Sequence, residues 1–429
     1  VTDDVHPEIA ARAIAAARMI GLDIAGVDVV CENIGQPLEE QGGGIVELNA
    51  APGLRMHLDP SYGKARDVGA AAIDALFAPG ENGRIPIVAV SGTNGKTTTV
   101  RLIAHLIGQS GRRMGMTTTD GVYVEDRRID TGDCSGPKSA RSVLLHPDVD
   151  AAVFETARGG MLREGLGFDR CKVAVVTNIG LGDHLGLNFI DTVDDLAALK
   201  RVVVQNVAPD GHAVLNACDA KVVEMAAYCP GKIIFFGSER HHPVIAAHKA
   251  QGHRTVYVDG GDIVAAEGEA EIQRIPLGQV RMTLGGKIGF QVDNAMASLA
   301  TAWALDLDWD TIQASLRGFD NDSASVPGRF NRFDFKGATV IADYGHNPDA
   351  IQALVRAIEA MPAKRRSVVI SATGDRRDED IRQQTEILGD AFDDVVLYQD
   401  QCQRGRADGE VLALLRQGLN QAKRAKAVE

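Results

Sequence analysis

The stretch "SGTNGKTTT" has the residue types of a phosphate-binding loop. Gly92 and Gly95 permit a close approach of the backbone to phosphates. Lys96 has the length to reach the β- and γ-phosphates, and the Thr97 hydroxyl can ligate Mg²⁺. The general pattern has a further glycine five residues before Gly95, where this chain has Val90. Val90 falls at the end of an apolar run, so it alters the entry into the loop and leaves the backbone donors in place. We therefore predict an ATP site.

The elements on either side of this loop are those that a nucleotide site requires. The run "RIPIVAV" predicts a buried strand before it, and Val100, Ile103 and Ile107 have helical spacing after it. A loop between a strand and a helix directs backbone N–H groups and the positive helix end at phosphates. Further apolar runs at 150–156 and 172–179, with helical segments between them, predict a mainly parallel α/β sheet.

The remaining regions differ from this one in their residue patterns. A helix over about 7–20 and two apolar runs predict an α/β piece at the start of the chain. Gly-rich short runs over 239–290, such as "RTVYVDGGDIVAAEGE" and "VRMTLGGKIGFQV", predict small antiparallel hairpins, followed by a helix over about 293–305. The segments "ATVIADY", "PDAIQALVRAIEAM" and "SVVISATG" predict a strand, a helix and a strand. The final "RAKAVE" shows no closing strand, so we expect this last unit to be cut short.

Composition excludes several classes of protein. The 429 residues, 45% hydrophobic and 24% charged, suit about three globular domains. A net charge of -13 argues against a nucleic-acid partner, and no apolar stretch is long enough for a membrane span. The start lacks both a signal peptide and an initiator Met, which suggests a piece of a longer chain. Six scattered cysteines predict neither disulfides nor a zinc site, which favours the cytoplasm.

The loop "GTNGKTTT" resembles the ATP-binding loop of the Mur ligase family, which departs from the general pattern in the same way. Other segments follow in that family's order: "FETARGGML", "VVTNIGLGDHLG", "LAALKRVV", "VDNAMASLATA", "VPGRF" and "VIADYGHNPDAI". The resemblance implies ATP and Mg²⁺ as cofactors, with the nucleotide held by Gly92, Thr93, Asn94, Gly95, Lys96, Thr97, Thr98, Asn294, Arg329, Asp343 and His346. The last motif also contains Tyr344 and Asn347.

The same resemblance implies a catalytic and metal-binding set. Lys96 would offset phosphate charge, Thr97 and Glu155 would coordinate one Mg²⁺, and His184 a second. Lys200 falls where many members carry a carbamylated lysine that helps to hold the second Mg²⁺. Taken alone, each residue has a plainer interpretation. Glu155 could form an ion pair, His184 could be a hydrogen-bonded structural residue, and Lys200 a solvated helix lysine.

The first part of the chain resembles a second kind of ligase. "DVVCENIGQPLEEQGGGIVELNAAPGLRMHL" resembles the end of an ATP-grasp ligase, whose metal ligands would be Asp28, Glu47 and Asn49. The alternative is two ordinary strands with an Asn-Ala-Ala-Pro-Gly turn. We thus predict four parts: the end of an ATP-grasp domain (1–78), a linker (79–84), a Mur ligase central P-loop domain (85–325), and a Rossmann-like C-terminal domain, truncated (326–429).

An ATP-grasp module ahead of a Mur-like module resembles the cyanophycin synthetase family, as do "TARGGMLREGLGFDRC" and "CQRGRADGEV". That family implies L-arginine, L-aspartate and a cyanophycin primer as substrates, and a homo-oligomer. Its Mur-like module joins arginine to aspartate β-carboxylates, and its ATP-grasp module adds aspartate. The ATP-grasp nucleotide-binding body is missing from this sequence, so we expect arginine addition alone.

The motif "GDRRDED" offers a candidate guanidinium site in Asp375, Asp378, Glu379 and Asp380. The alternative is the acidic first turn of a solvated helix.

Three other functions stay open. The chain could be another Mur-type ligase, of the folylpolyglutamate or peptidoglycan kind, although those lack an ATP-grasp fusion. A paralogue that uses a preformed dipeptide would be expected to lose the loop. A catalytically inactive module could bind polymer or organise an oligomer. ATP turnover separates the last from the enzymes, and amino-acid dependence separates the enzymes from one another.

Overall fold

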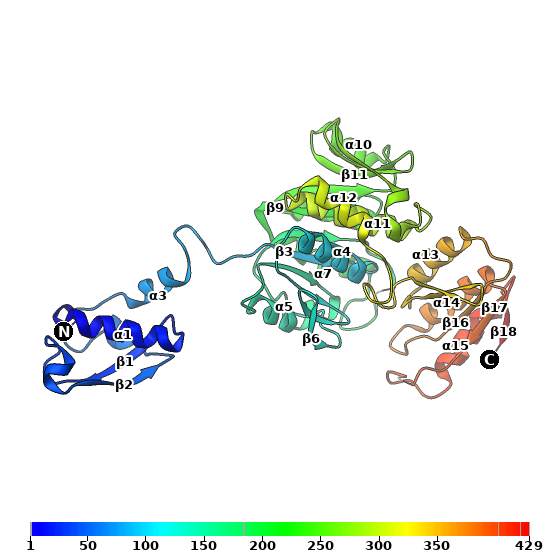
Figure 1. The fold of residues 1–429 in the computed structure, drawn as a ribbon. Coiled ribbons are helices and arrows are strands. Elements are labelled where there is room, and N and C mark those ends of the chain that lie inside the picture. Colours follow the sequence, from blue (N-terminus) through cyan, green and yellow to red (C-terminus); the bar gives the residue numbers. More distant parts are fainter. Residues whose placement is uncertain (1, 183–184, 402, 421, 429) are drawn as a thin grey trace. The chain divides into compact units, whose positions relative to one another are not determined.

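The computed structural model describes residues 2–182, 185–401, 403–420 and 422–428. The chain forms two compact units, Val1–Arg84 and Ile85–Glu429 (Figure 1). No helix in the described ranges is both long and apolar enough to cross a membrane.

The first unit packs helices against a small antiparallel sheet. It contains η1 (Thr2–Asp4), α1 (Pro7–Ile20), β1 (Gly26–Val30), η2 (Leu38–Gln41), β2 (Gly44–Asn49), α2 (Arg55–Leu58) and α3 (Val68–Leu76). The helix α1 starts with His6 accepting from the N–H of Glu8 and ends at Gly21, whose φ of 80° suits glycine. The predicted helix and two strands are confirmed. Of the described residues here, the buried apolar side chains are Ile9 and Leu38.

The second unit is built on a mixed sheet, which has 11 strands in the described ranges. The strands are β3 (Ile87–Ser91), β4 (Met114–Thr118), β5 (Gly121–Val124), β6 (Arg127–Thr131), β7 (Ala151–Glu155), β8 (Cys171–Val176), β9 (Val207–Asn216), β10 (Lys232–Gly237), β11 (Arg254–Asp259), β12 (Asp262–Glu267) and β13 (Ala270–Pro276). Their order is β13-β12-β11-β10-β9-β8-β3-β7-β4-β5-β6. Pairing is parallel from β4 to β11 and antiparallel at both ends, which confirms the predicted mainly parallel sheet.

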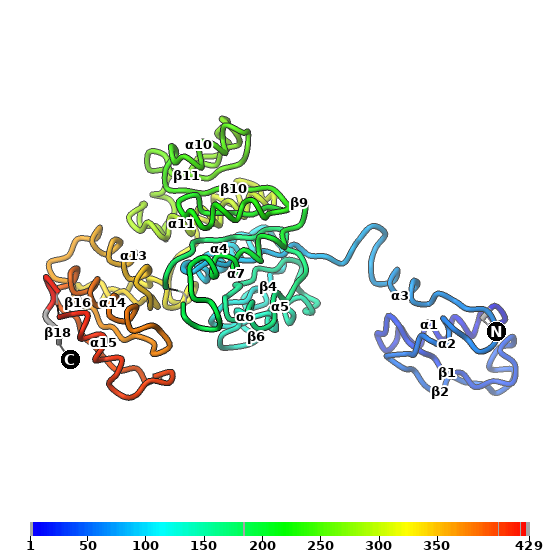
Figure 2. The backbone as a smooth tube through the Cα atoms, turned by 180° about the vertical axis from the view of Figure 1, so that it is seen from behind, coloured from blue at the N-terminus to red at the C-terminus, as the bar shows by residue number. Residues whose placement is uncertain are grey.

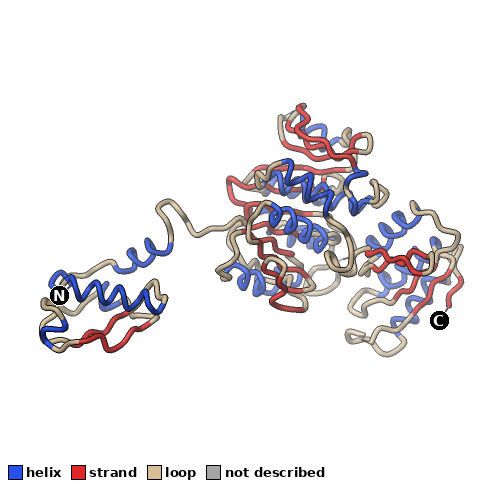
Figure 3. Tube along the Cα trace, viewed as in Figure 1, coloured by secondary structure: helices blue, strands red, loops and turns tan. Residues whose placement is uncertain are grey.

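Helices cover both faces of this sheet (Figure 3). They are α4 (Lys96–Gln109), α5 (Pro137–Leu144), α6 (Arg158–Glu164), α7 (Val193–Lys200), α8 (Val202–Gln205), α9 (Ala220–Glu224), η3 (Met225–Tyr228), α10 (Pro243–Ala250), η4 (Leu277–Gln279), η5 (Arg281–Thr283), α11 (Gly289–Ala304) and α12 (Trp309–Gly318). Strand β3 alternates between two cores, because Val88 and Val90 pack with α4 and α11, whereas Ile87 and Ala89 pack on the opposite face. This double burial explains the unbroken apolar run.

One prediction in this unit was partly wrong. Strands β11, β12 and β13 form the expected antiparallel hairpins. The segment "VRMTLGGKIGFQV" forms no hairpin, because its first part folds into the short turn η5 and its end belongs to α11. That helix begins at Gly289, ahead of the predicted start.

The C-terminal part carries smaller sheets. Strands β14 (Asn331–Phe335) and β15 (Ala338–Ala342) pair antiparallel, and β16 (Ser367–Ile370), β17 (Asp394–Leu397) and β18 (Lys426–Val428) pair parallel. The helices are α13 (Pro348–Glu359), α14 (Asp378–Ala391) and α15 (Glu410–Leu419). Helix α13 lies beside α11 (Figure 2). The prediction of no closing strand was wrong, because β18 pairs with β17. The strand is too short to show an apolar run in the sequence, and β17 supplies its backbone hydrogen-bond partners.

Candidate active site

The predicted phosphate loop joins β3 to α4 and depends on its glycines. Gly92 has φ 140° and Gly95 has φ 85°. A Cβ on Gly92 would lie 2.0 Å from Thr177 Oγ1, and one on Gly95 would lie 2.5 Å from Asn294 Oδ1. A side chain at either position would therefore collide with these neighbours, so both positions require glycine. Val90 is fully buried within β3, so the missing glycine of the general pattern belongs to the strand.

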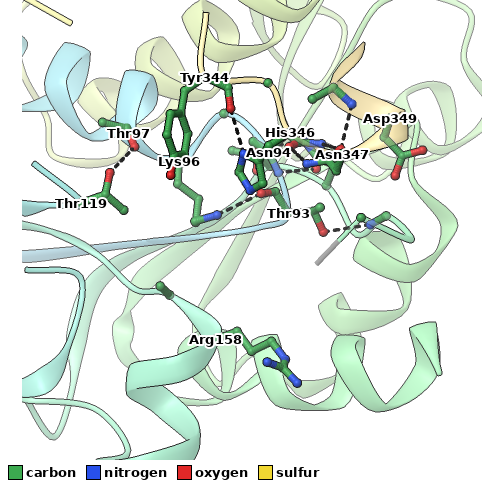
Figure 4. Close-up of a pocket in the computed structure, with 18 of the residues that line it drawn as sticks. Thr93, Asn94, Lys96, Thr97, Thr119, Arg158, Tyr344, His346, Asn347 and Asp349 are labelled. Carbon is green, nitrogen blue, oxygen red and sulfur yellow. Dashed lines mark hydrogen bonds between the residues drawn. The ribbon is translucent and has the colours of Figure 1, made fainter. Parts of the chain in front are cut away.

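The neighbouring strand end holds the loop in shape. The N–H of Thr93 donates to Asn178 O at 2.8 Å, and the N–H of Asn94 donates to Asn178 Oδ1 at 2.9 Å. Thr177 Oγ1 donates to Asn94 O at 2.6 Å. Lys96 Nζ donates to the Thr93 carbonyl at 2.9 Å and to that of Gly92 at 3.0 Å (Figure 4). The ammonium thus lies over a loop that has the geometry to bind phosphates.

Glu155 ends β7 beside the loop and is 2% exposed. Its Oε2 accepts from Thr97 Oγ1 at 2.9 Å and from the N–H of Thr119 at 3.2 Å. Burial raises the pKa of Glu155, and the charge of Lys96 and the Thr97 hydrogen bond oppose that shift. A carboxylate and a hydroxyl are hard oxygen donors of the kind that Mg²⁺ prefers, so this pair fits the predicted first metal.

Lys200 is fully buried at the end of α7, and its Nζ donates to Gly92 O at 2.8 Å. The alternative interpretation, a solvated helix lysine, was wrong. A capping box between Thr192 and Asp195 starts the helix that carries Lys200 to the loop. Predicted residue His184 lies outside the described residues, so its role stays a prediction, as does the carbamylation of Lys200.

The other predicted nucleotide residues gather around the same loop. Asn294, on α11, accepts from Thr99 Oγ1 at 3.2 Å and donates to Gln291 Oε1 at 2.9 Å. Thr98 is buried in the first turn of α4. Arg329 Nη2 lies 3.5 Å from Thr97 Oγ1, which places its guanidinium beside the Glu155–Thr97 pair.

Two predicted residues come from the segment between β15 and α13. Asp343 accepts from the N–H groups of Phe330 and Gly345 at 2.8 and 2.6 Å, and burial raises its pKa against those hydrogen bonds. His346 Nδ1 lies 2.8 Å from Tyr344 O, and the two rings meet edge to face. The cavity wall includes all three polar side chains, Asp343, Tyr344 and His346.

The C-terminal part contacts the loop directly through two asparagines. Asn347 Nδ2 donates to Asn94 Oδ1 at 2.9 Å, and Asn94 Nδ2 lies 3.4 Å from Asn347 Oδ1 (Figure 4). Asn347 also caps α13 by accepting from the N–H of Ala350. Asp349 lies against the loop that follows β8, because a Cβ on Gly180 would lie 2.2 Å from its Oδ2.

Most of these residues line one cavity of about 870 Å³, whereas Gly92 and Lys200 are not among its lining residues. The sequence analysis missed several of its lining residues: Thr119, Arg158, Arg163, Asp293, Arg376 and Arg404. The "ETARGG" segment contained a signal for Arg158, which follows Glu155 closely. Arg163, Asp293, Arg376 and Arg404 lie in segments that the sequence analysis quoted, but nothing in those segments showed which of their side chains would face the cavity.

The predicted guanidinium site is largely engaged with the chain's own arginines. Asp378 pairs with Arg406 at 2.8 Å, and Asp380 pairs with Arg377 at 2.7 Å. Both acids lie in the first turn of α14, where they complement the helix dipole. This favours the alternative interpretation for these two. Asp375 pairs with Arg404 and lines the cavity.

The predicted ATP-grasp ligands share one face of the first unit's sheet. Asp28 and Glu47 stand opposite each other in register, and Asn49 Nδ2 lies 3.4 Å from Asp28 Oδ2. Asp28 and Glu47 are exposed. Across the described ranges, no three His, Cys, Asp or Glu side chains are placed to hold a metal together. The metal role of this trio stays a prediction.

Two family models cover most of the second unit. Residues 90–302 match the Mur ligase middle domain, and residues 328–429 match the glutamate ligase domain of Mur ligases. Solved structures agree in fold: E. coli FolC in complex with DHPP and ADP has a TM-score of 0.57 at 19% identity, covering 81% of this chain and 80% of that one. MurF from Acinetobacter baumannii has a TM-score of 0.56 at 18% identity, covering 80% and 67%. The chain belongs to the Mur ligase family.

The expected resemblance to cyanophycin synthetases is confirmed. The chain is 42% identical to those of Trichormus variabilis over 424 residues and Synechocystis sp. over 429, which is 98% and 100% of its length. It spans about half of those relatives, 47% and 49%. A UDP-N-acetylmuramoyl-L-alanyl-D-glutamate--2,6-diaminopimelate ligase of Chlorobaculum tepidum is 25% identical over 401 residues, 88% of this chain and 71% of that ligase. Together these relatives support an ATP-dependent amino-acid ligase.

Proposed function

We propose that this cavity joins arginine to aspartate β-carboxylates of cyanophycin, with ATP and Mg²⁺. One observation carries the proposal: Lys96 and the buried Lys200 both donate to the Gly92 carbonyl, next to the hydrogen-bonded pair of Glu155 and Thr97. Two amines, a carboxylate and a hydroxyl lie at one phosphate loop. Such a set suits the transfer of a phosphoryl group from ATP to a carboxylate, in which both reactants are anions. The likeness to cyanophycin synthetases supports the choice of substrates.

The residues act on a reaction that brings negative charges together. A carboxylate is a poor electrophile, and when bound, ATP supplies the phosphoryl group that turns it into an acyl phosphate. Lys96 lowers the repulsion between the carboxylate and the phosphate. Glu155 and Thr97 would hold Mg²⁺, which supplies further positive charge. The arginine amine then displaces phosphate, forming the amide and releasing a proton. Asn294, Arg329, Asp343 and His346 would orient the nucleotide.

Lys200 has a separate proposed role. The amine of Lys200 is fully buried and lies at the phosphate loop, where it donates to Gly92 O. Carbamylation would convert it to an anion that, with His184, holds a second Mg²⁺. A mass increase on the tryptic peptide that contains Lys200, lost on mild acid treatment, would reveal the modification.

The first unit and the assembly belong to the same proposal. Asp28, Glu47 and Asn49 would be the metal ligands of an ATP-grasp module that adds aspartate in the whole protein, and the whole protein would be a homo-oligomer. This chain spans about half of its relatives, so we expect arginine addition from the residues present here.

The test is ADP release from Mg-ATP and an aspartate-ended cyanophycin primer, with and without arginine. Arginine-dependent release and a matching mass gain on the primer are expected. Release that depends on glutamate or diaminopimelate instead would make the chain another Mur-type ligase. Silence in folded protein would favour a module that only binds polymer.

A further inference from the structure

The cavity extends to both sides of the phosphate loop. Glu155 belongs to β7, which flanks β3 on one side. Asn216 on β9 and Phe236 on β10 line the cavity on the other side, two and three strands from β3. Neighbouring strands lie about 4.8 Å apart, so these groups are separated by the width of several strands.

Apolar side chains from α11 and α13 form another part of the cavity wall. Phe290 and Leu354 pack in one cluster, and Phe290 meets Phe330 edge to face at 5.7 Å between ring centroids. Leu354 lines the cavity together with Ala350 and Ala353. A flat, weakly polar ring fits this wall better than a charged polymer side chain does.

Asp293 contributes a carboxylate to this wall. It lies three residues after Phe290 on α11, which places both side chains on the same helix face. It also adjoins Asn294, whose Oδ1 faces Gly95 of the phosphate loop. Within the ranges that the structure describes, the Asp293 side chain makes neither a hydrogen bond nor an ion pair. Desolvation raises the pKa of Asp293 to about 6, although the residue keeps part of its surface exposed.

Such a carboxylate needs a hydrogen-bond donor from a ligand. An ionised carboxylate only accepts, and its desolvation is costly until a donor arrives. The edge of adenine presents an amine at position 6, whereas a 6-oxopurine presents there an oxygen that would repel the carboxylate and has its donor on the neighbouring N1 instead. Ribose hydroxyls are also donors, but they lie between the base and the phosphates.

We propose that Asp293 accepts a hydrogen bond from the 6-amino group of the nucleotide's adenine and thereby selects ATP over 6-oxopurine nucleotides. The inference rests on the proposed ATP site. It assigns base selection to a residue outside the motifs of the phosphate loop.

The experiment measures nucleotide binding by calorimetry, without primer or amino acid, so that it does not depend on the ligase reaction. The probes are ADP, IDP and 2′-deoxy-ADP, tested on the wild-type chain and on Asp293→Asn. The wild type should bind ADP about 10- to 100-fold more tightly than IDP, because IDP places a 6-oxo oxygen instead of an amine against the charged acceptor. Asp293→Asn should bring the two affinities within about threefold, since an amide can donate to a 6-oxo group.

Asp306→Asn is the matched control, because it removes the same charge from an exposed residue just beyond the end of α11. Its ADP-to-IDP ratio should equal that of the wild type. Equal binding of ADP and IDP by the wild type would overturn the inference, even if Asp293→Asn failed to fold. A second result would also overturn the inference: an Asp293→Asn protein that keeps the ADP preference but loses discrimination against 2′-deoxy-ADP. The carboxylate would then bind the ribose and not the base. Failure of every nucleotide to bind would instead refute the proposed ATP site.

Discussion

Gly95→Ala should separate loop geometry from general backbone strain. The substitution introduces a Cβ that would lie 2.5 Å from Asn294 Oδ1, at a residue with φ 85°. Asn294 cannot easily move, because it is 5% exposed and bonded to Thr99 and Gln291. Either Asn294 gives up one of those hydrogen bonds or the loop shifts.

Gly111→Ala is the matched control for that change. Gly111 also has φ 85°, just past the other end of α4, and a Cβ there would meet no atom within 4 Å. Both variants bear the left-handed strain of about 1–2 kcal/mol. Gly95→Ala adds the loss of a buried hydrogen bond, about 1–3 kcal/mol. Its midpoint of thermal unfolding should therefore fall several degrees below that of Gly111→Ala.

Activity should separate the two variants further. A shift of the loop N–H groups by about 1 Å is expected to lower ADP release about 100-fold in Gly95→Ala. Gly111→Ala should keep at least half of the wild-type rate. The assay is coupled ADP release at saturating Mg-ATP, on protein whose fold is checked by circular dichroism. A Gly95→Ala protein as active as Gly111→Ala would refute the assigned role of the loop.

Three further substitutions test the site. Lys96→Ala removes the ammonium over the loop and should lower ADP release about 100-fold or more; normal turnover would remove Lys96 from the site. Glu155→Gln should abolish Mg²⁺-dependent turnover, and it should also change stability in Mg²⁺-free urea titrations. Burial raises the folded-state pKa of Glu155, so its contribution to stability is full below its unfolded value near 4.5 and is lost as pH rises through the folded value. The free energy of unfolding of Glu155→Gln, taken relative to that of the wild type, should therefore rise with pH. A fall of this relative value with pH would contradict the reasoning. Asn347→Asp keeps the α13 cap but loses the donor to Asn94, so KM for ATP should rise several-fold with unfolding unchanged; an unchanged KM would mean that the contact does not support the loop.

The sequence predicted best what depends on local pattern. Val88 and Val90 alternate with Ile87 and Ala89 in β3, and a strand buried on both faces has an apolar run that is easily recognised. Glu155 could be placed beside the loop because parallel strands end at one edge of a sheet. The phosphate loop followed from the types and spacing of its residues.

Features that depend on tertiary contacts could not be predicted in this way. Lys200 looks like a surface lysine in its helix, and only the packing of α7 shows that it is buried against Gly92. The Asn94–Asn347 contact joins residues 253 positions apart. The strand β18 has no apolar pattern and depends on β17 for its pairing.

The acids of "GDRRDED" show the limit of reasoning from residue type. Carboxylates in a row suit an arginine substrate, but Asp378 and Asp380 pair with arginines of the same chain. Asp293 shows the opposite case, since it adjoins the predicted residue Asn294 but was not singled out from the sequence, and only the cavity places it beside Phe290.

The central claim is that the site activates a carboxylate with ATP before an amine attacks it. The most direct measurement is the transfer of ¹⁸O from labelled β-carboxylates of an aspartate-ended primer to inorganic phosphate during arginine-dependent turnover. The account predicts one ¹⁸O atom in phosphate for each amide formed. Amide formation with unlabelled phosphate would contradict it, because the carboxylate oxygen would then never have been bonded to phosphorus.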